Sequence, residues 1–223
     1  MAEFKKHCGV LILLVSTLWI TACSPQKQDD CGYVQNIYGQ RISWKSKAAI
    51  PIYIHSSVPV NLKPAIYRAA ATWEMQAGRK VFEISDDSSK LSATPTRDQK
   101  NGIYFLSDWE SDSSSEQGRT SVFWAGDEIQ EADIRINGAD FSFYDKNPSL
   151  LVGSLRRAKS ESNSMTPVDG YSFEALMVHE LGHFLGLKHR EDAGTVMATH
   201  LAAFTNRTQL SGTDQGALSC EYK

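Results

Sequence analysis

The sequence predicts a single globular domain of mixed α/β class, that is, an α+β fold. Two observations indicate this class. A strand, a helix and a strand follow one another between residues 50 and 84, and a second amphipathic helix lies far downstream, after three further strand candidates. A chain of 223 residues with 41% apolar and 22% charged residues has the size and composition of one domain with its own core.

The first three elements follow from residue spacing. The run Ile-Pro-Ile-Tyr-Ile over 50–54 is rich in β-formers and predicts a strand. Pro64 then opens a helical stretch that Gly78 can end in a left-handed conformation, and a strand over 81–84 follows. The apolar residues of this helix recur at helical spacing: Ile66, Ala69, Ala70, Trp73 and Ala77.

Later elements are also recognisable. Three apolar runs predict strands, over 102–106, 120–124 and 132–136. The last patterned segment, 210–222, has the spacing of a terminal helix. Short serine-rich stretches between the patterned segments predict loops, over 86–90, 111–119 and 159–167.

The N-terminus has the parts of a secretory signal. Lys5 and Lys6 form a basic start, and the apolar run over 9–20 that follows is short for a permanent membrane span. The chain is therefore expected to be exported. The net charge of −3 gives no indication of nucleic-acid binding.

The end of this signal, Ile20-Thr21-Ala22-Cys23, resembles the lipobox of bacterial lipoproteins. The resemblance implies a signal peptide over 1–22, lipid modification of Cys23 and a polar tether over 23–30, with the folded domain over 31–223. We then expect a membrane-anchored lipoprotein, and Ser24 favours the outer membrane if the cell has one. The alternative is an ordinary signal peptide followed by a coincidental cysteine.

The four cysteines can be assigned in turn. Cys8 lies in the predicted signal peptide and Cys23 is the predicted lipid attachment point. Cys31 and Cys220 then remain near the two ends of an exported domain, where thiols are oxidised. The simplest interpretation is a disulfide between Cys31 and Cys220.

The segment HELGHFLGLKH over 179–189 carries the strongest chemical signal. A helix capped by Ser172 would place His179 and His183 one turn apart on the same face. Gly186 can leave that helix in a left-handed conformation and turn His189 back toward them. Three imidazole ligands leave one position open for water, which is the arrangement of a catalytic zinc ion.

Glu180 follows the first histidine and can act as general base toward that water. The alternative is that these histidines are ordinary core or surface residues of an amphipathic helix. Three histidines, one glutamate and one glycine at fixed positions form a far more specific pattern than a bare HExxH. The sequence therefore favours the catalytic zinc site over that alternative.

These residues resemble the signature of the metzincin metalloproteases, HExxHxxGxxH followed by a methionine turn. Met197 lies eight residues after His189, which is similar to the matrixin branch, and by that resemblance it forms an apolar floor under the metal. The strand over 132–136 and the helix over 210–222 also look like matrixin elements. The resemblance implies a zincin fold: a twisted, mostly parallel sheet, a zinc-site helix and a small C-terminal subdomain.

The resemblance also implies function. We expect a monomeric zinc endopeptidase that binds one catalytic Zn²⁺ and cleaves protein or peptide substrates. The segment 118–124 is expected to be the edge strand that pairs with the substrate, although an internal strand is almost as good an assignment. The alternative function is a membrane-tethered zinc-binding or adhesion module without catalysis.

The chain departs from the family pattern in three respects. Outside the signal and the zinc segment only His55 and His200 remain, so a second, structural zinc site is not expected. Calcium sites are unsupported, because the acidic residues in the loops have no recognisable ligand spacing. Thr199 and Leu201 stand where matrixins usually have proline and tyrosine, so the substrate pocket wall is expected to differ.

Overall fold

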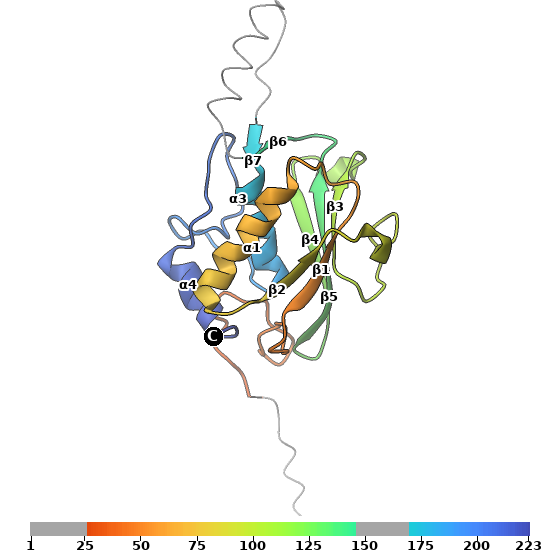
Figure 1. Ribbon diagram of the computed structural model, residues 1–223. Helices are drawn as coiled ribbons and strands as arrows, with labels where there is room; N and C mark the ends of the chain where they lie inside the picture. Colours follow the sequence, from red (N-terminus) through yellow and green to blue (C-terminus); the bar gives the residue numbers. More distant parts are fainter. Residues whose placement is uncertain (1–25, 146–169) are drawn as a thin grey trace, which may run out of the picture.

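The computed structural model describes residues 26–145 and 170–223 (Figure 1). The predicted signal peptide over 1–22, the predicted lipid site Cys23 and the predicted loop over 159–167 lie outside these residues. Among the described residues, no helix is both long enough and apolar enough to cross a membrane.

The described residues form seven strands and three α-helices, with two short 3₁₀ turns, η1 (Ser88–Lys90) and η2 (Ser111–Ser113). In chain order, the strands and α-helices are β1 (Ile50–Ile54), α1 (Lys63–Ala77), β2 (Phe82–Ser85), β3 (Gly102–Leu106), β4 (Gly118–Ala125), β5 (Glu128–Asn137), β6 (Ser142–Tyr144), β7 (Gly170–Ser172), α3 (Phe173–Phe184) and α4 (Gly212–Ser219).

The main sheet has five strands in the order β2-β1-β3-β5-β4. All neighbours in it pair in parallel except β4 and β5, which are antiparallel and joined by a hairpin turn. The prediction of a mixed fold with a mostly parallel sheet is therefore confirmed. Because β4 is the last strand in the order, the segment 118–124 lies at a sheet edge and not inside the sheet.

Helix α1 packs against α3 beside the sheet (Figure 1). Its predicted apolar stripe is buried, and Gly78 ends it with φ of 68°. Trp73 is fully buried, and its indole N–H donates to the carbonyl of Val178 on α3 at 2.9 Å. This bond satisfies the one polar atom of a large core side chain and fixes the two helices relative to each other.

Two elements differ from the sequence-based expectation. The strands β6 and β7 form a small parallel pair that was not predicted, because three residues are too few to show a period. The terminal helix is shorter than the predicted 210–222. It begins after the cap Ser211 and ends at Ser219, because Tyr222 turns into the core and donates its hydroxyl to the carbonyl of Leu185 at 2.7 Å.

The two ends of the domain are joined. Cys31 and Cys220 form the predicted disulfide, with their Cα atoms 6.5 Å apart. Arg41 adds a second link, because its guanidinium donates to the Asp29 carbonyl at 2.8 Å and pairs with Glu221. Residues directly before Cys31 also contact the domain, since the amide of Gln28 donates to the Gly39 carbonyl at 2.9 Å.

Asp214 links α4 to the preceding loop. Its buried carboxylate completes a capping box with Ser211 and also accepts from the Thr195 hydroxyl at 2.5 Å and the Val196 amide at 3.1 Å. We predict that Asp214→Ala lowers the free energy of unfolding by roughly 3 kcal/mol, because several buried donors lose their acceptor at once. Urea denaturation measures this.

The matched control is Asp87→Ala, which removes an exposed cap of the short turn η1. It should change the urea midpoint far less. Equal effects of the two substitutions would contradict a structural role of Asp214 in joining α4 to residues 195–196.

Candidate metal centre

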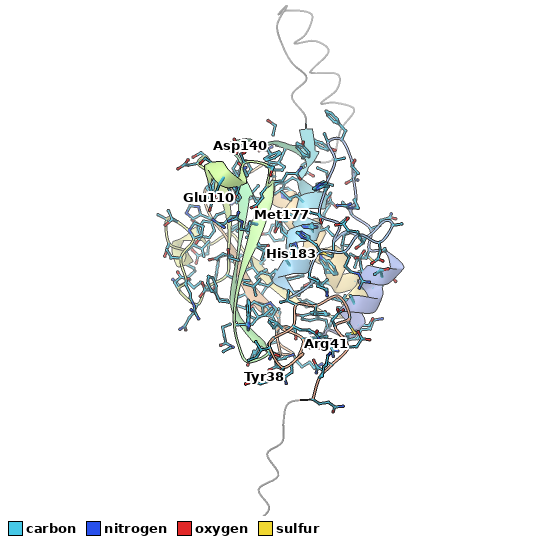
Figure 2. The ribbon with its side chains drawn as sticks, turned by 180° about the vertical axis from the view of Figure 1, so that it is seen from behind. Tyr38, Arg41, Glu110, Asp140, Met177 and His183 are labelled. Carbon is cyan, nitrogen blue, oxygen red and sulfur yellow. A yellow bond between two sulfur atoms is a disulfide. The ribbon has the colours of Figure 1, made fainter. Side chains whose placement is uncertain are left out.

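Helix α3 presents the first two histidines. Ser172 caps it as predicted, with its hydroxyl accepting from the Ala175 amide at 3.2 Å, and Glu174 lies in the first turn near the positive end of the helix dipole. His179 and His183 are one turn apart on the same face, and their ring centroids are 4.6 Å apart. Figure 2 shows His183 on α3 close to the sheet, and α3 contacts the edge strand β4.

Gly186 turns the chain out of the helix, as predicted. It has φ of 101°, and its amide donates to the His183 carbonyl at 2.9 Å. A Cβ atom at this position would lie 2.1 Å from the carbonyl oxygen of Ile42. The site therefore requires glycine both for the backbone conformation and for the close approach.

The turn brings His189 to the other two histidines. The Nε2 atoms of His179 and His183 are 3.0 Å apart, those of His183 and His189 are 3.0 Å apart, and those of His179 and His189 are 3.2 Å apart. A tetrahedral zinc ion bound at about 2.0–2.1 Å by three nitrogens needs them about 3.3–3.4 Å apart. The observed separations are slightly shorter, so the three residues fit a metal ion.

The other ring nitrogen of two histidines faces a carbonyl. Nδ1 of His179 lies 2.8 Å from the Val196 oxygen, and Nδ1 of His183 lies 2.7 Å from the Leu187 oxygen. A carbonyl only accepts, so each Nδ1 carries the proton and each Nε2 presents a lone pair. Burial lowers the pKa of His179 to about 3 and that of His183 to about 4, which keeps both rings neutral, as metal ligands must be.

Glu180 is buried beside this centre. Its carboxylate accepts a hydrogen bond from the Thr120 hydroxyl on β4 at 2.6 Å. Burial raises the pKa of Glu180 to about 7, the Thr120 hydrogen bond opposes this shift, and the negative charge of Glu116 adds to it. Gly118 leaves room for the other carboxylate oxygen, because a Cβ atom there would lie 2.9 Å from Oε1. The edge strand therefore orients Glu180.

The comparison with protein families decides the classification. The model of the Matrixin family of peptidases, Peptidase M10, matches residues 62–223, which include all three histidines and Glu180. The chain belongs to the matrixin family. No curated protein matches the chain significantly. Matrixins use zinc, and in the described part of this matrixin the three histidines form the one group of three or more His, Cys, Asp or Glu residues close enough to hold a metal ion.

Met197 of this matrixin lies against the histidine helix. It is buried, and a Cβ atom on Gly182 would lie 2.2 Å from its sulfur, so sulfur and helix backbone are in direct contact between the two helical histidines. The preceding residue, Val196, holds Nδ1 of His179 through its carbonyl and is itself held by Asp214 through its amide.

The roles of two of these residues, Asp214 and Thr120, were not predicted from the sequence. Asp214 was placed in the last helix but given no link to the metal centre, although the pattern Ser211-x-x-Asp214 is a capping-box signal that could have indicated the fixed helix start. Thr120 was placed only in a strand, and no local pattern in the sequence indicates that its hydroxyl reaches Glu180.

A cleft of about 620 Å³ opens over the metal centre. The edge strand β4 borders it along one side, and residues of the 198–201 segment border it as well. Its lining includes apolar side chains, among them Val34, Ile42 and Trp124, and polar ones, among them Glu116, Arg119 and His200.

We predict that Gly186→Ala destabilises the fold by about 3 kcal/mol or more and weakens zinc binding, because the new methyl group would overlap the Ile42 carbonyl and displace His189. The matched control is Gly78→Ala. Gly78 also has a positive φ, of 68°, but a Cβ atom there meets nothing within 4 Å. It should cost only the backbone strain of about 1–2 kcal/mol.

Thermal unfolding and a zinc titration of both variants test this pair. If the two substitutions had equal effects on stability and on zinc affinity, the close approach of Gly186 to Ile42 would have no role in placing His189.

Proposed function

We propose that this matrixin is a zinc-dependent endopeptidase in which His179, His183 and His189 hold the metal and Glu180 is the general base. The observation that carries the proposal is the convergence of three unprotonated imidazole nitrogens beside a buried carboxylate at the floor of a cleft. When bound, zinc would supply Lewis acidity that activates water and polarises a peptide carbonyl.

Glu180 supplies the proton chemistry in this proposal. It follows His179 directly, it is not one of the three metal-holding residues, and Thr120 fixes one of its carboxylate oxygens. The second oxygen is free to accept the proton of the attacking water and later to deliver it to the leaving amine. A carboxylate that is buried, oriented and available for proton transfer favours an enzyme over a module that only binds zinc.

The substrate class follows from the edge strand. The outer edge of β4 is unpaired within the described sheet and runs along the cleft, so an extended peptide can add to it through main-chain hydrogen bonds. Val34 and Trp124 line the cleft and suit bulky apolar side chains of the peptide, whereas the charge of Arg119 is already paired with Glu116.

The setting is also part of the proposal. The N-terminal pattern supports export and anchoring through a lipid on Cys23, which would place the cleft of a monomeric enzyme near a membrane surface. The disulfide between Cys31 and Cys220 fits this setting, because disulfides persist in oxidising compartments.

The first test replaces the general base. Glu180→Gln should bind one zinc ion as the wild type does but lower kcat on denatured protein or quenched-fluorescence peptides by at least about 100-fold. The control is Glu174→Gln, an acid on the first turn of the same helix that pairs with Arg68, which should leave kcat within about twofold. A zinc-loaded wild type that cleaves no peptide would favour the tethered zinc-binding module instead.

The second test removes only a hydroxyl. Thr120→Val keeps the shape of the side chain but loses the hydrogen bond to Glu180, so kcat should fall about tenfold while KM and zinc content stay unchanged. Thr120→Ser keeps the hydroxyl and should retain most of the activity. Equal activity of the valine and serine variants would mean that Thr120 does not orient the base.

A further inference from the structure

Residues 32–34, which follow Cys31, lie against the turn that precedes His189. The Lys188 amide donates to the Gly32 carbonyl at 2.9 Å, and the Val34 amide donates to the Gly186 carbonyl at 2.9 Å. Between these bonds Tyr33 and Leu187 form an isolated antiparallel bridge. Residues 32–34 therefore act as a short strand beside the three residues that precede His189.

This short strand packs against one side of the turn formed by residues 186–188. The Ile42 amide donates to the Val34 carbonyl at 2.9 Å, and the Ile42 carbonyl is the atom that requires glycine at position 186. The ring of Tyr33 is fully buried next to Tyr222, with centroids 6.4 Å apart. The path of residues 186–188 is thus fixed from outside by the N-terminal segment.

His189 depends on that path more than the other two histidines do. His179 and His183 are on a buried helix, and each has a carbonyl opposite its Nδ1. His189 is exposed, lies on a turn, and no carbonyl opposite its Nδ1 is found among the described residues. Its direction is therefore set by the main chain on either side, by residues 186–188 before it and by the Arg190 amide after it, which donates to the Met197 carbonyl at 3.0 Å.

The disulfide anchors the start of this short strand. The Cys31 amide bonds only to its neighbour Asp29, and the Asp30 carboxylate pairs with the exposed Lys188 at 2.7 Å. The covalent link from Cys31 runs to Cys220, which caps the end of α4. Through Asp214, the same helix holds Val196, whose carbonyl faces His179.

The disulfide thus joins the segment that fixes the turn before His189 to the helix that, through Asp214, holds Val196 beside His179. We propose that the Cys31–Cys220 disulfide is a positioning element of the metal centre, so that the oxidised protein retains its metal ion and the reduced protein releases it much faster. The proposal goes beyond the protease assignment, because it requires only that the three histidines bind a metal ion.

The chemistry is an ordinary thiol–disulfide exchange. The two cysteine thiols lose two protons and two electrons to an oxidant of the disulfide class, which leaves as two thiols while one S–S bond forms in the protein. The link through Arg41 and Glu221 remains after reduction, so the domain stays folded while residues 31–34 loosen. The chain in a reducing compartment would then hold zinc weakly and become a stable zinc protein only after oxidation.

The test is the rate of zinc release from the full chain to a coloured chelator. The double variant Cys31→Ser with Cys220→Ser should release zinc at least about tenfold faster than the oxidised wild type. The control is Val81→Ala, which removes buried core volume directly before β2, the strand at the opposite edge of the sheet from β4. It lowers global stability but should leave the release rate within about twofold.

Two outcomes would overturn the proposal: unchanged release from the double variant, or an equal acceleration in the double variant and in Val81→Ala after correction for their unfolding midpoints. If the double variant does not fold, reduction of folded, zinc-loaded wild type by a phosphine gives the same readout. A wild type that retains zinc but cleaves nothing would sink the protease assignment and leave this inference standing.

Discussion

The structure depends on bringing three imidazole nitrogens to within 3.2 Å of one another. In a metal-free protein this arrangement is unfavourable, because the Nε2 lone pairs of His179 and His183 point at the same space while burial suppresses protonation of both rings. The surrounding structure therefore has to impose the geometry. A cation held by the three nitrogens would replace this repulsion with coordination, and metal binding would then be coupled to the stability of the fold.

Elements far apart in the sequence share this task. Helix α3 carries two histidines, the loop before α4 supplies the carbonyl that orients His179, and the N-terminal segment fixes the turn before His189. The indole of Trp44 and the hydroxyl of Tyr222 bind the carbonyls of Phe184 and Leu185, where the helix ends. These bonds satisfy acceptors that a helix end leaves open. The edge strand then orients Glu180, so the sheet contributes to the position of the proposed general base and also borders the cleft.

Local sequence patterns predicted the parts of this arrangement that are local. The spacing of His179, His183 and Gly186 determines their geometry within one helix and one turn, and the caps Ser172 and Gly78 lie where predicted. The disulfide was predictable because the predicted signal peptide and the predicted lipid site leave only two cysteines for it. The contacts of Thr120 with Glu180, of Asp214 with Val196 and of residues 32–34 with 186–188 were not predictable. Each depends on how distant segments pack. A single polar residue in a strand or helix has no sequence periodicity from which its hydrogen-bond partner could be predicted.

X-ray absorption of the zinc-loaded protein at the zinc K-edge reports the type and distance of the metal ligands, and it requires no assumption about activity. We expect three nitrogen ligands at about 2.0–2.1 Å together with a further light-atom ligand, and one nitrogen ligand fewer in His189→Ala. Sulfur ligation at about 2.3 Å, or a spectrum that His189→Ala leaves unchanged, would contradict this expectation.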